Sequence, residues 1–183
     1  MGLYGSNVEY GLHCLLHLVG PSAGAPVSSR DLAAFQGVSP SLVAKLFTQL
    51  QKAGIVASAE GIRGGFRLAK PPGDISVFDV VRALDGDKPL FQCRDIRRNC
   101  ILYGDDPPAS ATRGVCAIHA VMLDAEKRML DALRSHTLAS LAGTVDGKTT
   151  AKYADLKRRW FGERHTDRQT PARLRSKSSG KSK

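Results

Sequence analysis

Residues 38–70 read VSPSLVAKLFTQLQKAGIVASAEGIRGGFRLAK, and the spacing of their apolar residues changes part-way along the stretch. In the first half, Ser39 is suited to cap a helix and Pro40 to fill its first position. The apolar residues that follow recur every three or four positions, which predicts one buried helical face before Gly54 ends the helix. These apolar residues are Leu42, Val43, Leu46 and Leu50.

The second half of this stretch alternates as β-strands do. Runs at Ile55–Ala59 and Phe66–Ala69 flank a glycine-rich tip, which predicts a β-hairpin. Upstream, Ser28 or Ser29 is placed to cap the short helical segment RDLAAFQ, which Gly37 closes. Two short helices, joined by a tight turn and followed by a hairpin, predict a winged helix-turn-helix.

The remaining segments predict a mainly α fold with a small β-wing. Residues 8–18 and 75–84 read as helices, and a loop-like stretch leads to a long amphipathic helix. The apolar residues of that helix, from Ile118 to Leu133, recur at the three- and four-residue steps of a dimer seam. We expect a winged helix-turn-helix domain at residues 1–84, a cysteine loop at 85–117, a dimerisation helix at 118–145 and a basic, disordered tail at 146–183.

The net charge of +10 is concentrated near the C-terminus. Residues 147–183 contain 12 Lys and Arg against 3 Asp and Glu, whereas residues 1–146 contain 15 against 14. Residues 30–70 have a local excess, with 6 basic and 2 acidic residues, so this segment is where a DNA-binding surface is expected. The basic tail predicts either additional phosphate contacts or a solubilising end without a fold of its own.

Several classes of protein are disfavoured. No apolar run is long enough to cross a membrane, and the N-terminus lacks the pattern of a cleavable leader, so we expect a cytoplasmic protein without membrane contact. No phosphate-binding loop, dinucleotide glycine motif or nucleophile–base pair occurs at a recognisable spacing, which argues against an enzyme. The segment HCLLH lacks the adjacent glutamate that a zinc hydrolase uses as base.

The residue types in the helix-turn-helix and hairpin suit duplex DNA. Ser39, Ser41 and Lys45 are expected to face bases or phosphates in the major groove. Arg63, at the hairpin tip, is placed to enter the neighbouring minor groove. The plainer interpretation is a solvated basic face on a small α+β domain, and the attached hairpin favours DNA binding over it. Backbone phosphate contacts are expected from Lys52, Arg67 and Lys70.

The cysteines raise the question of a metal site. FQCRDIRRNC carries Cys93 and Cys100, and GVCAIHAVM carries Cys116 with His119 three positions later. In a reducing compartment, such thiols are more often ligands or free thiols than disulfides. Thiolates are the soft ligands that iron–sulfur clusters need, and imidazole can replace some of them. Cys14, within an apolar helix, is expected to be a small core residue.

The stretch VSSRDLAAFQGVSPSLVAKLFTQLQKAGIVASAEGIRGGFRLAKPPGDISVFDVVRALDG, followed by a cysteine loop and CAIHAVM, resembles the Rrf family (type two) of winged-helix iron–sulfur transcription regulators, of the IscR and NsrR kind. The resemblance runs from about Leu3 to Leu141. It implies a homodimer built on the long helix, a roughly palindromic double-stranded DNA operator and, in many members, an iron–sulfur cluster. The sequence departs from the family pattern at Glu60, where arginine is common, and in the long interval between Cys100 and Cys116.

The resemblance also implies a set of cluster ligands. VEYGLHC is similar to the opening of redox-sensing members that hold a [2Fe–2S] cluster with two cysteines, a glutamate and a histidine. By that similarity the ligands are Glu9, His13, Cys93 and Cys116, with the first helix of one chain near the cysteine loop of its partner. A competing set around a [2Fe–2S] or [4Fe–4S] cluster comprises Cys93, Cys100 and Cys116 with His119 or Glu9.

The expected function is that of a DNA-binding transcription regulator, a repressor, whose operator affinity is set by the redox state or integrity of the cluster. The alternative is a regulator on the same frame without a cluster, which senses through plain thiols such as Cys100 or through a small molecule. Iron content separates the two, because only the first requires it.

Overall fold

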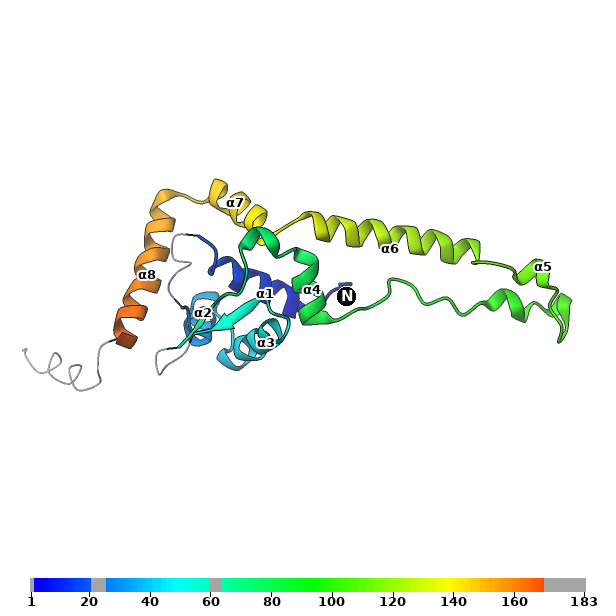
Figure 1. Ribbon diagram of the computed structural model, residues 1–183, viewed down its shortest axis with the longest axis horizontal. Helices are drawn as coiled ribbons and strands as arrows, with labels where there is room; N and C mark the ends of the chain where they lie inside the picture. Colours follow the sequence, from blue (N-terminus) through cyan, green and yellow to red (C-terminus); the bar gives the residue numbers. More distant parts are fainter. Residues whose placement is uncertain (1, 21–25, 60–63, 170–183) are drawn as a thin grey trace, which may run out of the picture.

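The computed structural model describes residues 2–20, 26–59 and 64–169, and it consists of a helical body from which an arm extends (Figure 1). The expected mainly α fold with a small β-wing is confirmed. In the described part of the chain, no helix combines the length and the apolar character that a membrane span requires. In chain order the elements are α1 (Ser6–Leu16), α2 (Ser29–Gln36), α3 (Pro40–Lys52), β1 (Val56–Ser58), β2 (Phe66–Leu68), the 3-10 turn η1 (Pro72–Asp74), α4 (Val77–Asp85), the 3-10 turns η2 (Ile96–Asn99) and η3 (Ile101–Tyr103), α5 (Ala109–Thr112), α6 (Ala117–Ser135), α7 (Leu138–Lys148) and α8 (Ala151–Gln169).

Helices α2 and α3 form the expected helix-turn-helix. The Ser28 hydroxyl accepts the Asp31 N–H at 3.0 Å and so caps α2. Gly37 adopts a φ of 66°, a left-handed conformation that lets the chain turn into α3. Ser39 precedes α3, but its hydroxyl caps no N–H of the helix and instead pairs with the Ser41 hydroxyl at 2.7 Å. Both serine side chains therefore stay on the exposed surface.

The wing is the antiparallel pair β1 and β2, in which Val56 lies opposite Leu68. Val27 anchors this pair to the body, because its N–H donates to the Phe66 carbonyl at 3.1 Å and its carbonyl accepts the Phe66 N–H at 2.8 Å. Gly65 is required at this contact, since a Cβ there would lie 2.8 Å from the Val27 carbonyl group. The base of the wing is thus fixed to the segment that precedes α2.

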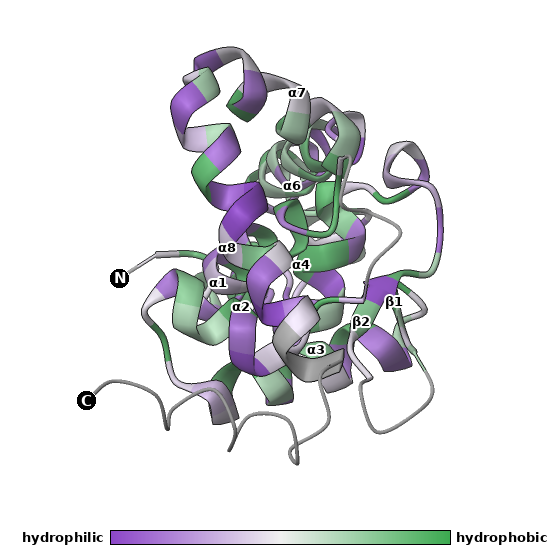
Figure 2. Cartoon of the chain, turned by 90° about the vertical axis from the view of Figure 1, so that its left-hand side faces the viewer, coloured by the Kyte–Doolittle hydropathy of each residue, from purple (hydrophilic) through white to green (hydrophobic). Residues whose placement is uncertain are grey.

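Helix α3 supplies the centre of the hydrophobic core. The Phe47 side chain is fully buried, and its ring centroid lies 4.9 Å from that of Phe66 in the wing. Helices α1, α2 and α4 pack around α3, and Figure 2 shows that each of them carries both hydrophobic and hydrophilic residues. The buried residues of α3 are Val43, Leu46, Phe47 and Leu50, which is the face expected from the sequence, with Phe47 added and Leu42 only partly covered.

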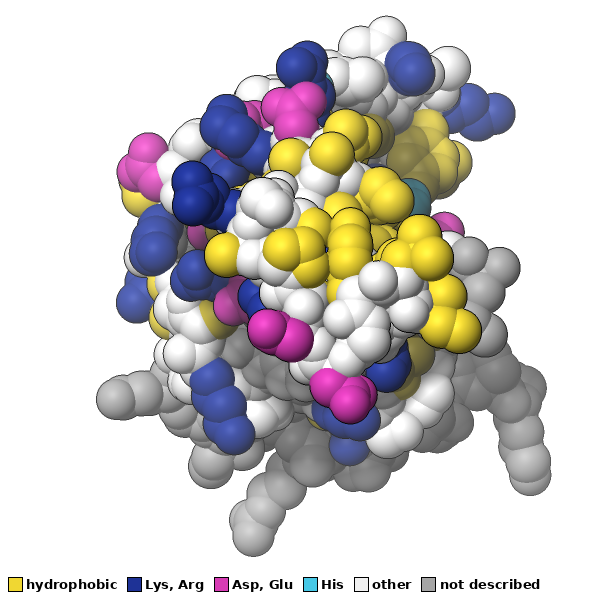
Figure 3. Space-filling view, turned by 90° about the vertical axis from the view of Figure 1, so that its right-hand side faces the viewer, with side chains coloured by type: hydrophobic (Ala, Val, Ile, Leu, Met, Phe, Trp, Pro, Cys, Tyr) yellow, Lys and Arg dark blue, Asp and Glu magenta, His cyan; other side chains and the backbone are white. Residues whose placement is uncertain are grey.

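The arm (residues 86–135) leaves the end of α4 and returns to the body as α6 (Figure 1). No residue of α6 is buried, and its contact with the body includes the Arg134 guanidinium, 4.3 Å from the centroid of the Phe78 ring. Figure 3 looks onto the outer end of the arm, where hydrophobic side chains gather. The most exposed of the arm's large apolar residues are Ile96, Ile101, Leu102, Val115, Ile118 and Val121.

The segment 118–145, expected as one dimerisation helix, consists of two helices. Helix α6 ends at Ser135 because the next residues take an extended conformation and pair with the segment before α4. The His136 carbonyl accepts the Val77 N–H at 2.8 Å, which closes this contact. Thr137 then caps α7 by accepting the Ser140 N–H.

The expected disorder of residues 146–183 is corrected for the part that forms α8. Trp160 and Phe161 dock this helix on α2, with both ring centroids 5.0 Å from that of Phe35. The Arg164 guanidinium lies 4.1 Å from the centroid of the Trp160 ring and 3.9 Å from a carboxylate oxygen of Asp31. Basic composition alone predicted a solvated tail, and two adjacent aromatic residues are enough to dock it. Residues 170–183 lie outside the described part of the chain.

His17 is the polar member of this aromatic cluster. Its ring centroid lies 4.7 Å from that of Phe35 and 5.5 Å from that of Phe161, and its Nε2 lies 2.6 Å from Nε2 of Gln36. Burial, helped by the nearby charge of Lys157, lowers the pKa of His17 to about 4. The imidazole is therefore neutral at physiological pH.

We predict that Phe47→Ala lowers the free energy of unfolding by about 3–5 kcal/mol, because it leaves a cavity at the contact between α3 and the wing. Urea denaturation followed by circular dichroism measures the change. Thr48→Ala, at the adjacent exposed position, is the matched control and should stay within about 0.5 kcal/mol of the parent. Equal stabilities of the two variants would contradict this account of the core.

We also predict that the protein loses stability as pH falls from about 6.5 to about 4, the interval between the ordinary and the folded-state pKa of His17. In this interval the unfolded chain binds a proton that the folded chain excludes, so the contribution is present above pH 6.5. It amounts to on the order of 3 kcal/mol. The unfolding midpoint should depend less on pH in His17→Gln than in the parent. His136→Gln, at an exposed histidine, should keep the parental dependence.

Candidate functional site

The exposed face of α3 carries most of the expected DNA-contacting residues. Ser41, Lys45 and Lys52 are exposed and lie four and seven positions apart, so they project from one side of the helix. Within the described residues, neither lysine forms an ion pair. This face therefore presents positive charge that no carboxylate of the described chain neutralises.

The wing extends the same basic surface. Arg67 points outward from β2 while its neighbours in the strand are partly buried, and Lys70 follows the strand in an exposed position. The Gln51 amide donates to the Ser58 hydroxyl at 3.2 Å and joins α3 to β1. Arg63 belongs to the segment 60–63, which lies outside the described residues. The remaining expected residues are all exposed on α3 or the wing, which is the arrangement a duplex requires.

The cysteine segment of the arm carries three free, partly buried thiols, at Cys93, Cys100 and Cys116. The Cys93 sulfur accepts the Asp95 N–H at 3.4 Å. His119 lies nearby in the chain, with its ring centroid 6.1 Å from that of Phe91. These residues place thiol donors on both the outgoing and the returning segment of the arm.

An arginine–carboxylate network joins the outgoing and the returning segment of the arm near its cysteines. Arg97 donates to a carboxylate oxygen of Asp95 at 2.6 Å and, through another nitrogen, to the Gly114 carbonyl at 2.6 Å. Hydrogen bonds from Arg97 and Arg98 hold the pKa of the Asp95 carboxyl below its usual range. The network keeps the region of Cys93 beside that of Cys116. The sequence did not indicate these roles, because the run DIRR does not show which carboxylate or carbonyl its arginines contact.

Glu9 and His13 lie on the body, not on the arm. Both are exposed on α1 and border an apolar groove of about 620 Å³ between α1 and α7, whose lining includes Leu12 and Leu141. Cys14, next to His13, points into the core, where burial raises the pKa of its thiol to about 11. Cys14 is thus a structural residue, as expected.

A single chain does not assemble either of the expected ligand sets. Within the described residues, no group of three or more histidines, cysteines or carboxylates lies close enough to hold a metal ion. The thiols are on the arm, which extends away from the part of α1 that carries Glu9 and His13 (Figure 1). An iron–sulfur cluster with the first set of ligands therefore fits this chain only if a second chain brings its arm to α1.

Comparison with known proteins identifies the family. Residues 4–144 match the Rrf2 family, described as iron-dependent transcriptional regulators. An HTH-type transcriptional regulator of Mycobacterium tuberculosis is 32% identical over 160 residues, which cover 87% of this chain and 93% of the relative. The solved structure of IscR from T. potens has a TM-score of 0.59 and 26% identity, covering 80% of this chain and 90% of that one.

A second solved structure is similar to the same extent. CymR, the global cysteine regulator of B. subtilis, has a TM-score of 0.54 and 26% identity, covering 79% of this chain and 98% of that one. The family and the Mycobacterium tuberculosis relative are described as transcriptional regulators, which agrees with the expectation that the chain is not an enzyme. The chain belongs to the Rrf2 family of transcriptional regulators, as its winged helix-turn-helix and cysteine loop indicated.

Proposed function

We propose that the protein is a homodimeric repressor whose affinity for a double-stranded DNA operator follows the redox state or integrity of a [2Fe–2S] cluster. The observation that carries the proposal is the division of the candidate ligands between α1 and the arm, together with free thiols at the arm positions. A divided set makes the site depend on a second chain. The family match to iron-dependent regulators supports the same proposal.

Exposed apolar surface supports the homodimer. Ile101 and Leu102 are 93% and 87% exposed, and the apolar side chains of α6 continue this surface. Large exposed apolar patches mark sites at which a protein contacts a partner. The groove between α1 and α7 offers apolar walls on the body. We propose that the arm of each chain covers this part of its partner and brings Cys93 and Cys116 to the partner's α1.

In this arrangement Glu9 and His13 of one chain and Cys93 and Cys116 of the other are the four ligands. Such a cluster would supply one-electron redox chemistry, at a potential that imidazole in place of a thiolate raises. The chain's own contribution is to hold the thiols on a rigid support, since Arg97 fixes the cysteine segment through the Gly114 carbonyl. The Asp95 N–H donates to the Cys93 sulfur and helps to hold it in position.

The arm is joined to the DNA-binding domain through α4. This helix packs on α3, and its last residue, Asp85, directly precedes the arm. A change in the position of the arm can therefore reach the helix that enters the major groove. Regulation requires that the two states of the arm differ in DNA affinity, because a ligand or redox change shifts only equilibria for which its interaction differs between states.

A regulator without a cluster is the second candidate, favoured by the three free cysteines and the likeness to CymR. In that case oxidation of a thiol on the arm, for example to a disulfide, replaces the cluster as the signal. The DNA-binding surface and the dimer are the same in both.

We predict that Arg67→Ala lowers the slope of log Kd against log salt concentration for duplex DNA by about 1, because the guanidinium neutralises one phosphate of the backbone. Fluorescence anisotropy with a labelled duplex of random sequence measures the slope, so the operator is not needed. Lys127→Ala, on α6 and away from the wing, is the control and should leave the slope unchanged. An unchanged slope in Arg67→Ala would remove the wing from the DNA interface.

We predict that anaerobically purified protein contains about two iron and two sulfide per chain, as a [2Fe–2S] cluster requires. Cys93→Ala should lose the visible absorption, whereas Cys100→Ala should keep it. Loss of absorption in Cys100→Ala would instead support the competing set of three cysteines. Colourless parent protein that iron and sulfide do not reconstitute would favour the thiol regulator.

Co-expression of two variants tests whether the site spans two chains. One variant lacks the α1 ligands (Glu9→Ala, His13→Ala) and the other lacks the arm ligands (Cys93→Ala, Cys116→Ala). Their heterodimer should recover half of the parental iron, because one complete site forms between the chains. Heterodimers free of iron would contradict the proposed arrangement.

A further inference from the structure

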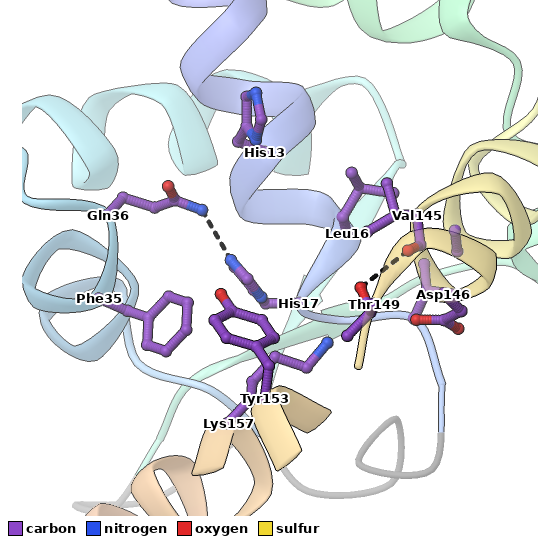
Figure 4. A pocket seen from close by; sticks show the side chains of 12 residues that line it. His13, Leu16, His17, Phe35, Gln36, Val145, Asp146, Thr149, Tyr153 and Lys157 are labelled. Atoms are coloured by element: carbon purple, nitrogen blue, oxygen red, sulfur yellow. Dashed lines mark hydrogen bonds between the residues drawn. The ribbon is translucent and has the colours of Figure 1, made fainter. Parts of the chain in front are cut away.

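Four helices of the body enclose a cavity away from the arm. Helices α1, α2, α7 and α8 surround about 260 Å³, slightly less than typical drug-sized ligand sites and enough for a small ligand (Figure 4). Leu16, Val19 and Phe35 give it apolar walls. Several of its lining residues lie beyond residue 144, where the match to the family ends, so α8 completes a cavity that the family region alone does not enclose.

One polar atom in the wall of this cavity has no partner. The Gln36 amide nitrogen lies 2.6 Å from His17 Nε2 and, as a donor, requires Nε2 to accept (Figure 4). The proton of the neutral ring is then on Nδ1, which is buried without a hydrogen-bond partner among the described residues. A buried unsatisfied N–H destabilises the protein until an acceptor meets it.

The charged groups at the cavity favour an acceptor with one negative charge. Lys157 of α8 lines the cavity, its charge acts on His17, and it forms no ion pair within the described part of the chain. Asp146 lines the cavity on the side away from Gln36 (Figure 4). A second negative charge on a ligand would meet the Asp146 carboxylate. Thr149, also in the wall, already donates its hydroxyl hydrogen to the Val145 carbonyl at 2.8 Å.

We propose that this cavity binds a small monocarboxylate with a short apolar body. The carboxylate accepts a hydrogen bond from the Lys157 ammonium, and a second from His17 Nδ1 once the side chains that cover this nitrogen shift to expose it. The apolar body packs on Phe35 and its neighbours. A ligand in this position touches α2, the first helix of the helix-turn-helix, and α8 at the same time. Because Phe35 and Gln36 end α2 just before the turn into α3, an occupied cavity restrains the DNA-binding motif directly.

Intrinsic fluorescence of the full-length chain tests the proposal, since Trp160 is its single tryptophan and contacts Phe35 in the cavity wall. Benzoate is the probe, and benzamide and phthalate are its neutral and doubly charged counterparts, compared at constant ionic strength. Benzoate should produce a saturable change, and benzamide and phthalate should bind at least about tenfold more weakly. No saturable change with benzoate up to about 10 mM, or equal binding of benzamide, would overturn the proposal.

Matched variants locate the binding. Lys157→Gln should weaken benzoate binding by about tenfold or more, because it removes a charged hydrogen-bond donor. Lys152→Gln, an exposed lysine of the same helix outside the cavity, should bind as the parent does. Asp146→Asn should strengthen phthalate binding, a gain that a misfolded variant cannot produce. Unchanged affinities in Lys157→Gln and Asp146→Asn would place the binding elsewhere. The readout involves neither DNA nor iron, so it stands apart from the proposed regulatory function.

Discussion

A short contact between residues 75–77 and 136–138 determines where the arm leaves the body and where it returns. Backbone hydrogen bonds of 2.8 and 2.9 Å join these two segments. Ser76 and Thr137, which pair across the contact, each form a capping box, so the same few residues begin α4 and α7. Ile75, Val77 and Leu138 are buried beside them. The long loop formed by the arm is thus closed by one small contact, and the positions of its thiols relative to the body depend on it.

The arm itself has little hydrophobic core, which constrains how it can be used. Its cysteine segment is held mainly by Arg97 and its partners, while residues such as Ile101 remain in water. If a cluster forms between two chains, iron binding and dimerisation are thermodynamically linked, and each strengthens the other. Loss of the cluster would then weaken the contact between the arm and the partner chain. A site divided in this way couples the chemical state of the arm to the geometry of a dimeric DNA-binding protein.

The parts of the fold that could be predicted from sequence are those in which local pattern and tertiary packing agree. The apolar stripe that ends at Leu50 and the glycine-rich hairpin each have a local sequence pattern that predicts their structure. The winged helix-turn-helix could therefore be predicted. The extended segment at His136 could not be predicted in this way, because it depends on a pairing with a segment distant in the sequence, and this pairing overrides helix propensity. The docking of α8 depends on Trp160 meeting Phe35, a long-range contact that a basic composition conceals. The cluster ligands could be proposed only by resemblance, since one chain does not bring them together.

Helix α8 is polar over most of its surface, and a helix of this kind is stable only where it docks. Its attachment rests on Trp160 and Phe161 against Phe35, and on Arg164 near Asp31. The cavity beside this attachment borders His17, whose Nδ1 is buried without a hydrogen-bond partner among the described residues. A ligand that fills the cavity contacts α2 and α8 together and therefore stabilises the docked state over the undocked one by RT ln(1 + [L]/Kd). The C-terminal extension would then respond to a ligand in this cavity, and the arm to redox state at the neighbouring groove, since His13, Leu16 and Val145 line both. Both inputs would act on the helix-turn-helix, through α2 in the first case and through α4 in the second.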